Sequence, residues 1–161
     1  MTDGTGRQQL PAAVIEALRQ PAGETVAIVA TVDDDGAPRT ATFGAMRPIT
    51  PETLRFACNR GHVTYDNIVR DGRVMVAVFA PPDVAVGIRG RARVLEERMD
   101  TLPDDALVQI DVEHIKSDHM PNAPIASGIT YTVSRGVAAH LDAVNAELEA
   151  AAPPTWGVSR P

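Results

Sequence analysis

The clearest alternation of hydrophobic and polar positions lies within residues 84–95, where small or apolar residues and arginines take turns. A period of two places successive side chains on opposite faces of a β-strand. One face of this stretch carries Ile88, Gly90, Ala92 and Val94, and the other carries Arg89, Arg91 and Arg93. The pattern therefore predicts a long strand with one packed face and one cationic face.

Other short apolar runs, rich in β-branched residues and bounded by turn residues, predict further strands. Asp33 to Gly36 is a turn signal that joins the first two strands into a hairpin, and Pro48 to Pro51 marks a second turn. The expected strands, besides 84–95, cover residues 24–32, 39–46, 53–59, 73–80 and 106–115.

Helices are expected in three places, and in the first and the last of them apolar residues recur every three or four positions. The first helix is expected over residues 10–20, with Leu10, Val14, Ile15 and Leu18 on one face. A short helix is expected over 63–70, before Asp71 and Gly72. The last is expected over 135–150, where Val137, Leu141, Val144 and Leu148 share a face.

Six strands joined mostly by short turns predict a mainly β fold with flanking helices, an antiparallel meander that closes into a barrel. We expect one domain over residues 1–161, because chains of this length usually form one core. Its parts are a helix at 10–20, a barrel core at 24–115, a loop at 116–134, a helix at 135–150 and a tail at 151–161.

Composition narrows the function classes. The formal charge is −6 and Lys116 is the only lysine, which disfavours general nucleic-acid binding. Cys58 is the only cysteine, so an internal disulfide and a cysteine-rich zinc site are excluded. The run His114, Asp118, His119 has no defined ligand face, so no metal site is expected. No leader or membrane-spanning stretch is recognisable, which predicts a cytoplasmic protein that acts without membrane or nucleic-acid partners.

The most informative stretch runs from residue 54 to residue 78, where a strand ends and a helix starts at once. The first turn of a helix has unpaired N–H groups and a positive dipole end, which together suit a phosphate. His62 and Thr64 would add side-chain donors there, and Arg39, Thr40 and Thr42 on the preceding hairpin would complete the pocket. The usual structural explanation of these residues is also open, since threonine is common in strands and at helix starts.

In its segments VAIVATVDDDGAPRTATF, GHVTYDNIVRDGRVMVAV and VGIRGRARVLEE, the chain resembles the pyridoxamine phosphate oxidase-like, FMN-binding split-barrel proteins. The resemblance covers residues 26 to about 97, and residues 62–64 with Asn67 and Ile68 look like the small FMN-binding members. Many members carry a Lys or Arg where this chain has Val63 and Thr64. Phosphate affinity would then rest on Arg39, Arg60 or an arginine of a second subunit.

The resemblance implies a homodimer of six-stranded barrels with FMN at the subunit interface. The phosphate would lie near Thr42, His62 and Thr64, and the ring against strand residues between Ala45 and Asn59. The full set of expected cofactor contacts is Arg39, Thr40, Thr42, Ala45, Met46, Ala57, Cys58, Asn59, His62, Val63, Thr64, Asn67 and Arg91. The deazaflavin F420 is an alternative cofactor, and heme is the least expected one.

The activity implied is FMN-dependent oxidoreduction, with hydride exchange between the flavin and a nicotinamide or small organic substrate. A non-catalytic flavin-binding or electron-carrier protein, an F420-dependent reductase and a structural dimer with a decayed pocket remain alternatives. No catalytic residue is identified: His119 and Tyr131 are proton donors by type only, and Cys58 is interpreted as a small buried hydrophobe. Trp156 would either cover the flavin or lie free in the tail.

Overall fold

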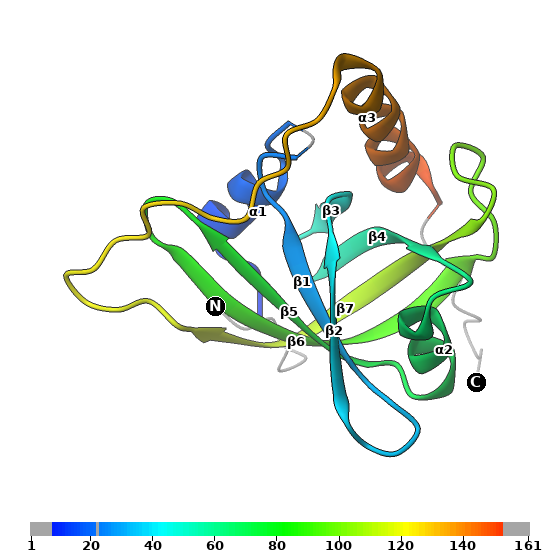
Figure 1. The fold of residues 1–161 in the computed structure, drawn as a ribbon. Coiled ribbons are helices and arrows are strands. Elements are labelled where there is room, and N and C mark those ends of the chain that lie inside the picture. Colours follow the sequence, from blue (N-terminus) through cyan, green and yellow to red (C-terminus); the bar gives the residue numbers. More distant parts are fainter. Residues whose placement is uncertain (1–7, 22, 153–161) are drawn as a thin grey trace, which may run out of the picture.

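The computed structural model describes residues 8–21 and 23–152. These residues form one seven-stranded antiparallel sheet with the strand order β2-β1-β5-β6-β7-β4-β3, and three helices (Figure 1). The strands are β1 (Ala27–Val32), β2 (Pro38–Phe43), β3 (Met46–Thr50), β4 (Thr53–Asn59), β5 (Arg73–Ala80), β6 (Val84–Glu96) and β7 (Asp105–Ser117). The helices are α1 (Ala12–Leu18), α2 (Val63–Arg70) and α3 (Arg135–Ala150).

The sheet corrects the prediction of a closed six-stranded barrel. The edge strands are β2 and β3, which are joined in sequence by Gly44 and Ala45 but form no ladder with each other in the described structure. The expected strand 39–46 ends at Phe43, and the supposed turn at Pro48 belongs to an additional strand. Proline is tolerated there because β3 is an edge strand and needs no N–H on its open side.

The other elements lie where the periodicity predicts them, with ends shifted by a few residues. The alternation along β6 is confirmed: Ile88, Gly90 and Ala92 are buried, whereas Arg89 and Arg91 are exposed. In α1, the predicted face is also confirmed, since Val14 and Leu18 are 1% and 3% exposed. Of the described helices, none is long and apolar enough to cross a bilayer.

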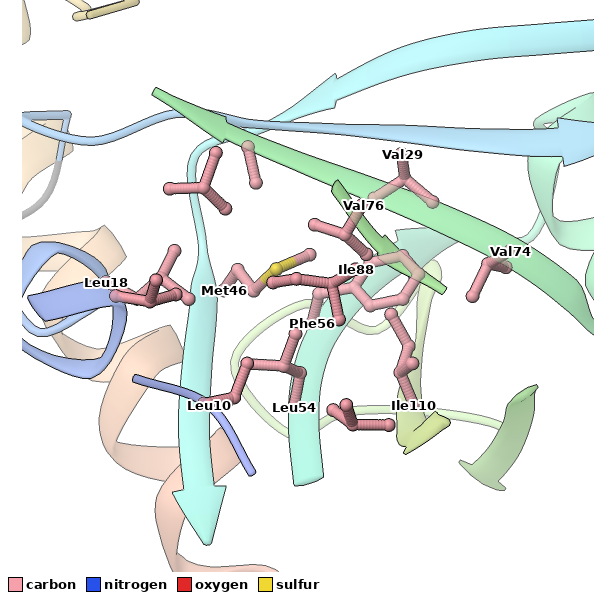
Figure 2. Close-up of a cluster of buried hydrophobic side chains, with 14 of the residues drawn as sticks. Leu10, Leu18, Val29, Met46, Leu54, Phe56, Val74, Val76, Ile88 and Ile110 are labelled. Carbon is pink, nitrogen blue, oxygen red and sulfur yellow. The ribbon is translucent and has the colours of Figure 1, made fainter. Parts of the chain in front are cut away.

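The main core lies inside the curled sheet, between its concave face and α1 (Figure 2). Phe56 on β4 is fully buried at its centre, and its ring meets that of Phe43 edge-on, with centroids 4.7 Å apart. Phe43 is the last residue of β2, so this contact joins the edge strand β2 through side chains to β4, which lies next to the opposite edge strand β3. Aromatic pairs in this geometry add about 0.5–1.5 kcal/mol beyond their buried area.

A second, smaller core lies under α3, where Val144 and Leu148 cover Ala57, Leu107 and Met99. Only the second half of the helix packs in this way, because Val137 near its start is 48% exposed. The predicted apolar face of 135–150 is therefore only partly used.

Two buried arginines, direct neighbours across β3 and β4, anchor the helix ends. Arg47 donates to the carbonyl oxygens of Leu18 (2.5 Å) and Gln20 (3.2 Å) at the end of α1. Arg55 is 1% exposed and donates to the carbonyl oxygens of Leu148 (3.0 Å) and Ala151 (2.6 Å) at the end of α3. Unpaired carbonyls at a helix C-terminus carry partial negative charge, which compensates the two guanidinium groups.

The segment 118–134 contains no helix or strand and crosses the β5–β6 hairpin on its way to α3 (Figure 1). Backbone hydrogen bonds fix it at four places: to Ala85 from Asp118, to Pro82 from Ile125, to Val26 through the Ile129 carbonyl, and to Gly23 from Tyr131. We call it the crossing segment. It passes so close to β5 that a Cβ at Gly128 would lie 2.1 Å from the Phe79 carbonyl oxygen.

Candidate functional site

The start of α2 is an uncapped helix N-terminus that is open to solvent. His62 occupies the N-cap position but makes no side-chain capping bond, and the N–H groups of Val63 and Thr64 have no partner in the described structure. His62 and Val63 are exposed, whereas the Thr64 side chain is 4% exposed. Two free N–H groups at the positive end of a helix dipole are a ready site for an anion.

Asn59 and Arg60 shape the approach to this helix. The Asn59 side chain accepts from Gly61 N (2.9 Å) and donates to Asp105 (2.9 Å), which fixes the turn between β4 and α2. Arg60 donates to the backbone carbonyls of Pro103 and Asp104, so its charge stays beside the helix start. The strand end, the turn and the helix start form one rigid corner.

A polar network holds α2 against the β1–β2 hairpin. Buried Asn67 donates to Thr31 (2.9 Å) and to Asp33 (2.7 Å), and Arg39 donates to the same Asp33 carboxylate at 2.9 Å. The hydrogen bond from Arg39, followed by that from Asn67, lowers the pKa of Asp33 below its usual value. Arg70 extends the network by donating to Asn67. Arg39 and Asn67 thus position the helix.

The sheet register separates the residues expected to form one phosphate pocket. Arg39 pairs with Thr31 and shares its face, the face on which α2 lies. Thr40 and Thr42 point to the opposite face, where the Tyr131 hydroxyl donates to Thr42 at 2.8 Å. Within one chain, the two threonines and the start of α2 therefore lie on opposite sides of the sheet.

The expected ring contacts are also divided. Met46 and Cys58 face the main core with 4% and 0% exposure, and Ala57 lies on the other face of β4, under α3. Burial raises the pKa of the Cys58 thiol to about 12, with a smaller contribution from Asp105. Half-buried Ala45 packs beside the same small core. Asn59 is in direct contact with the start of α2, because its carbonyl oxygen accepts from His62 N at 3.1 Å.

Arg91, the last expected contact, lies at the other end of α2, where it donates to the Asp71 carbonyl (3.3 Å). It belongs to a groove of about 440 Å³ on the sheet face opposite α2, which we call the arginine groove. The groove is defined by Arg73, Arg89, Arg91, Ala30, Val32 and Met75.

The sequence singled out the arginine stripe of β6 but not the rest of this groove. Cross-strand pairing brings Ala30, Met75 and Arg89 into one row over β1, β5 and β6, and Thr40 extends the row onto β2. Met75, at 41% exposure, is an uncovered large apolar side chain in the middle of a strand. The signal available in the sequence was Met75 itself. It alternates with the packed valines of β5 and therefore points to the outer face of the strand, where a polar residue is usual.

Comparison with protein families gives a match to the model described as pyridoxamine 5'-phosphate oxidase over residues 13–124, more than half of the chain. A search among curated proteins gives no match. Three similar solved structures are a candidate pyridoxamine 5'-phosphate oxidase from Lactobacillus delbrueckii, a protein called F420 reductase and an FMN-binding protein from Syntrophomonas wolfei.

The first shares 22% identity, with 68% of this chain and 94% of that chain covered and a TM-score of 0.56. The second shares 18%, with 66% and 98% covered and a TM-score of 0.54. The third shares 13%, with 66% and 84% covered and a TM-score of 0.53. At these identities the structural likeness establishes the fold.

Proposed function

Since the chain belongs to the pyridoxamine 5'-phosphate oxidase family, we propose that it is a flavin-dependent oxidoreductase that binds FMN at the start of α2 and works as a homodimer. The family supports a flavin-type cofactor, and the names of two structural neighbours, an FMN-binding protein and an F420 reductase, agree with one. The observation that carries the position is the uncapped helix start with the free N–H groups of Val63 and Thr64.

The chain's own residues would bind and orient the cofactor. The N–H groups of Val63 and Thr64 would donate to the phosphate, and the His62 side chain, which makes no capping bond, would add a third donor. Arg60 would contribute positive charge beside them. A bound FMN would supply hydride exchange with a nicotinamide or small organic molecule.

A second copy of the chain completes the site in this proposal. Thr40 and Thr42 are exposed on the sheet face that their own α2 does not reach. In a homodimer they would contact the cofactor held by the partner, because a two-fold interface presents the same surface from both subunits. Cys58 takes no part, since a thiol with a pKa of about 12 stays protonated in the core.

A matched pair of substitutions on α2 tests the position of the phosphate. Val63→Glu places a carboxylate beside the free N–H groups, where it would repel a phosphate. A negative charge at a helix N-terminus stabilises the helix, so a loss of binding would not be explained by loss of the helix. Val69→Glu makes the same change at an exposed valine near the other end of the helix. We expect FMN affinity, measured by flavin fluorescence quenching, to fall at least about tenfold for Val63→Glu only.

Equal affinity of both variants and the unmodified protein would remove the start of α2 from the site. Turnover is tested separately, by the oxidation of NADH or NADPH by protein loaded with FMN. A saturable rate supports the oxidoreductase, and no rate with either donor leaves a flavin-binding carrier. Parallel loading with F420 decides between the two cofactors by their relative affinities.

A further inference from the structure

We propose that a cavity between α1, the β5–β6 turn and the crossing segment binds an aliphatic polyamine. In Figure 1 these three parts of the chain lie together, on the side away from α2. The volume of the cavity, about 670 Å³, falls within the range of about 300–1,000 Å³ that is usual for small-molecule sites. We call it the acidic cavity and define it by Ala13, Glu16, Glu24, Ala80, Asp83 and Val84.

The acidic cavity lies on the concave side of the sheet, away from the face that the proposed homodimer uses. Ala17, Ala80 and Val84 line it and also belong to the main core, which fills that side. Thr40 and Thr42 lie on the opposite face, together with the arginine groove. β5 begins next to the end of α2 and ends at the cavity, so the whole strand separates the cavity from that helix. A ligand here would compete neither with a second subunit nor with FMN.

The charged side chains of the cavity are all negative. Glu16 on α1, Glu24 before β1 and Asp83 in the β5–β6 turn come from three separate segments, and the described lining contains no Lys, Arg or His. Within the described parts of the chain, none of the three carboxylates forms an ion pair or a side-chain hydrogen bond. Pro81 and Pro82 line the cavity without offering a backbone N–H. The lining therefore suits a cation and not an anion.

The basic residues nearest to the cavity do not compensate this charge. Arg19 and Arg47 line a different hollow, which they share with Glu149. Arg47 pairs with Glu149 at 3.3 Å. Lys116 on β7 pairs with Asp118 at 2.6 Å, so that pair adds no net charge. Three negative charges are thus left around one hollow.

The walls of the cavity determine the rest of the ligand's chemistry. Ala13 and Ala17 of α1 face Ala80 and Val84 across it, and together they form an aliphatic surface between the carboxylates. Methylene groups placed against such a surface gain from their removal from water. A polyamine carries separated ammonium groups joined by methylene chains, so it satisfies the carboxylates and the aliphatic wall together. A compact metal ion would leave the wall uncovered.

The first test is isothermal titration of the full-length protein with spermidine in about 0.15 M salt, where charges more than about 8 Å apart are largely screened. Two control ligands separate charge from chain. 1,8-Octanediol has an aliphatic chain of similar length without charge, and we expect it to bind at least about tenfold more weakly. Magnesium chloride supplies positive charge without a chain and should also bind at least about tenfold more weakly. Equal binding of spermidine and of either control would overturn the proposal.

A matched pair of substitutions on α1 tests whether the ligand enters the cavity. Ala13→Phe fills the hollow without changing a charge, so spermidine affinity should fall at least about tenfold. Ala12→Phe makes the same change at an exposed neighbour that does not line the cavity, and affinity should stay as it is. Equal affinity of the two variants would mean that spermidine binds outside the cavity, which overturns the proposal.

The carboxylates are tested by neutral substitutions at exposed positions. Glu16→Gln, Glu24→Gln and Asp83→Asn should each weaken spermidine binding about threefold, and the effects should multiply in the triple variant. Asp142→Asn removes one negative charge on α3, outside the cavity, and should leave the affinity unchanged. An equal loss in Asp142→Asn would reduce the binding to general attraction by an acidic protein and would refute a specific site.

Two further readouts separate this site from the function proposed above. FMN affinity of Ala13→Phe and of the triple variant should equal that of the unmodified protein. Loss of FMN together with spermidine would assign the cavity to the cofactor site and overturn a separate one. Light scattering should show an unchanged oligomeric state, and a dimer that dissociates in these variants would make the cavity part of a subunit interface and likewise overturn the proposal.

Discussion

Replacing Arg55 by methionine should loosen α3 from the sheet. The buried guanidinium donates to Gln109 on β7 (3.2 Å) and to the Leu148 and Ala151 carbonyls at the end of α3. Methionine fills much of the same space but donates nothing. A buried polar group left without a partner costs about 1–3 kcal/mol, and burying an uncharged side chain recovers part of the desolvation cost of the arginine. We therefore expect the free energy of unfolding to fall by about 3 kcal/mol.

The measurement is urea denaturation followed by circular dichroism, with hydrogen exchange to locate the change. Arg55→Lys keeps the charge but offers a smaller set of donors, so its loss should be about half as large. Arg19→Met, at an exposed arginine next to α1, should change the unfolding free energy by less than about 0.5 kcal/mol. The reasoning is refuted if Arg55→Met loses less than about 1 kcal/mol, or if exchange rises elsewhere in the sheet but not in α3.

Two other predictions concern the loops around α3. Glu147 accepts from Asp100 N, Thr101 N and the Thr101 hydroxyl; burial raises its pKa, but these bonds outweigh burial and the net pKa is lowered. Stability from Glu147 is thus present above the ordinary glutamate pKa and lost as pH falls through the folded value. In urea titrations, Glu147→Gln should therefore be destabilising at pH 7, and the difference from the unmodified protein should shrink as the pH is lowered through the acidic range. Gly128→Ala should lower the melting temperature, because the new Cβ would lie 2.1 Å from a backbone oxygen. Gly136→Ala should raise the melting temperature slightly, because this position in α3 has open space around it. A higher melting temperature for Gly128→Ala than for Gly136→Ala would contradict the close approach of the crossing segment to β5.

Most strands and all three helices of the described structure were predictable, because their periodicity is strong and their ends carry turn residues. The additional strand β3 was not, since Pro48 is a turn signal in any local interpretation of the sequence. Its place at the sheet edge is decided by pairing with β4, a contact that local sequence does not encode. The prediction of a closed barrel is wrong for a related reason. The expected strand 39–46 is divided at Gly44, and its two parts belong to β2 and β3, the opposite edges of the sheet.

The site was predictable only where function depends on the backbone. A strand that ends in a turn and a helix start is visible in the sequence, and the free N–H groups of Val63 and Thr64 lie where that pattern places them. The faces of β2 and β4 were harder to assign. Which side of Ala57 is covered depends on α3, which is far away in sequence, and Thr42 is turned from α2 by a register set on β1.

The pairing of Arg47 and Arg55 also affects how the chain folds during synthesis. Both arginines are made early, and Arg47 finds its carbonyl acceptors at once because α1 precedes it, although its ion pair with Glu149 of α3 forms later. Arg55 must wait until the end of α3 leaves the ribosome, about 90 residues later, for its carbonyl acceptors. Until then, a cation lies on an uncovered patch of β4 next to Ala57, so this end of the sheet stays exposed to chaperones and proteases longer than the rest.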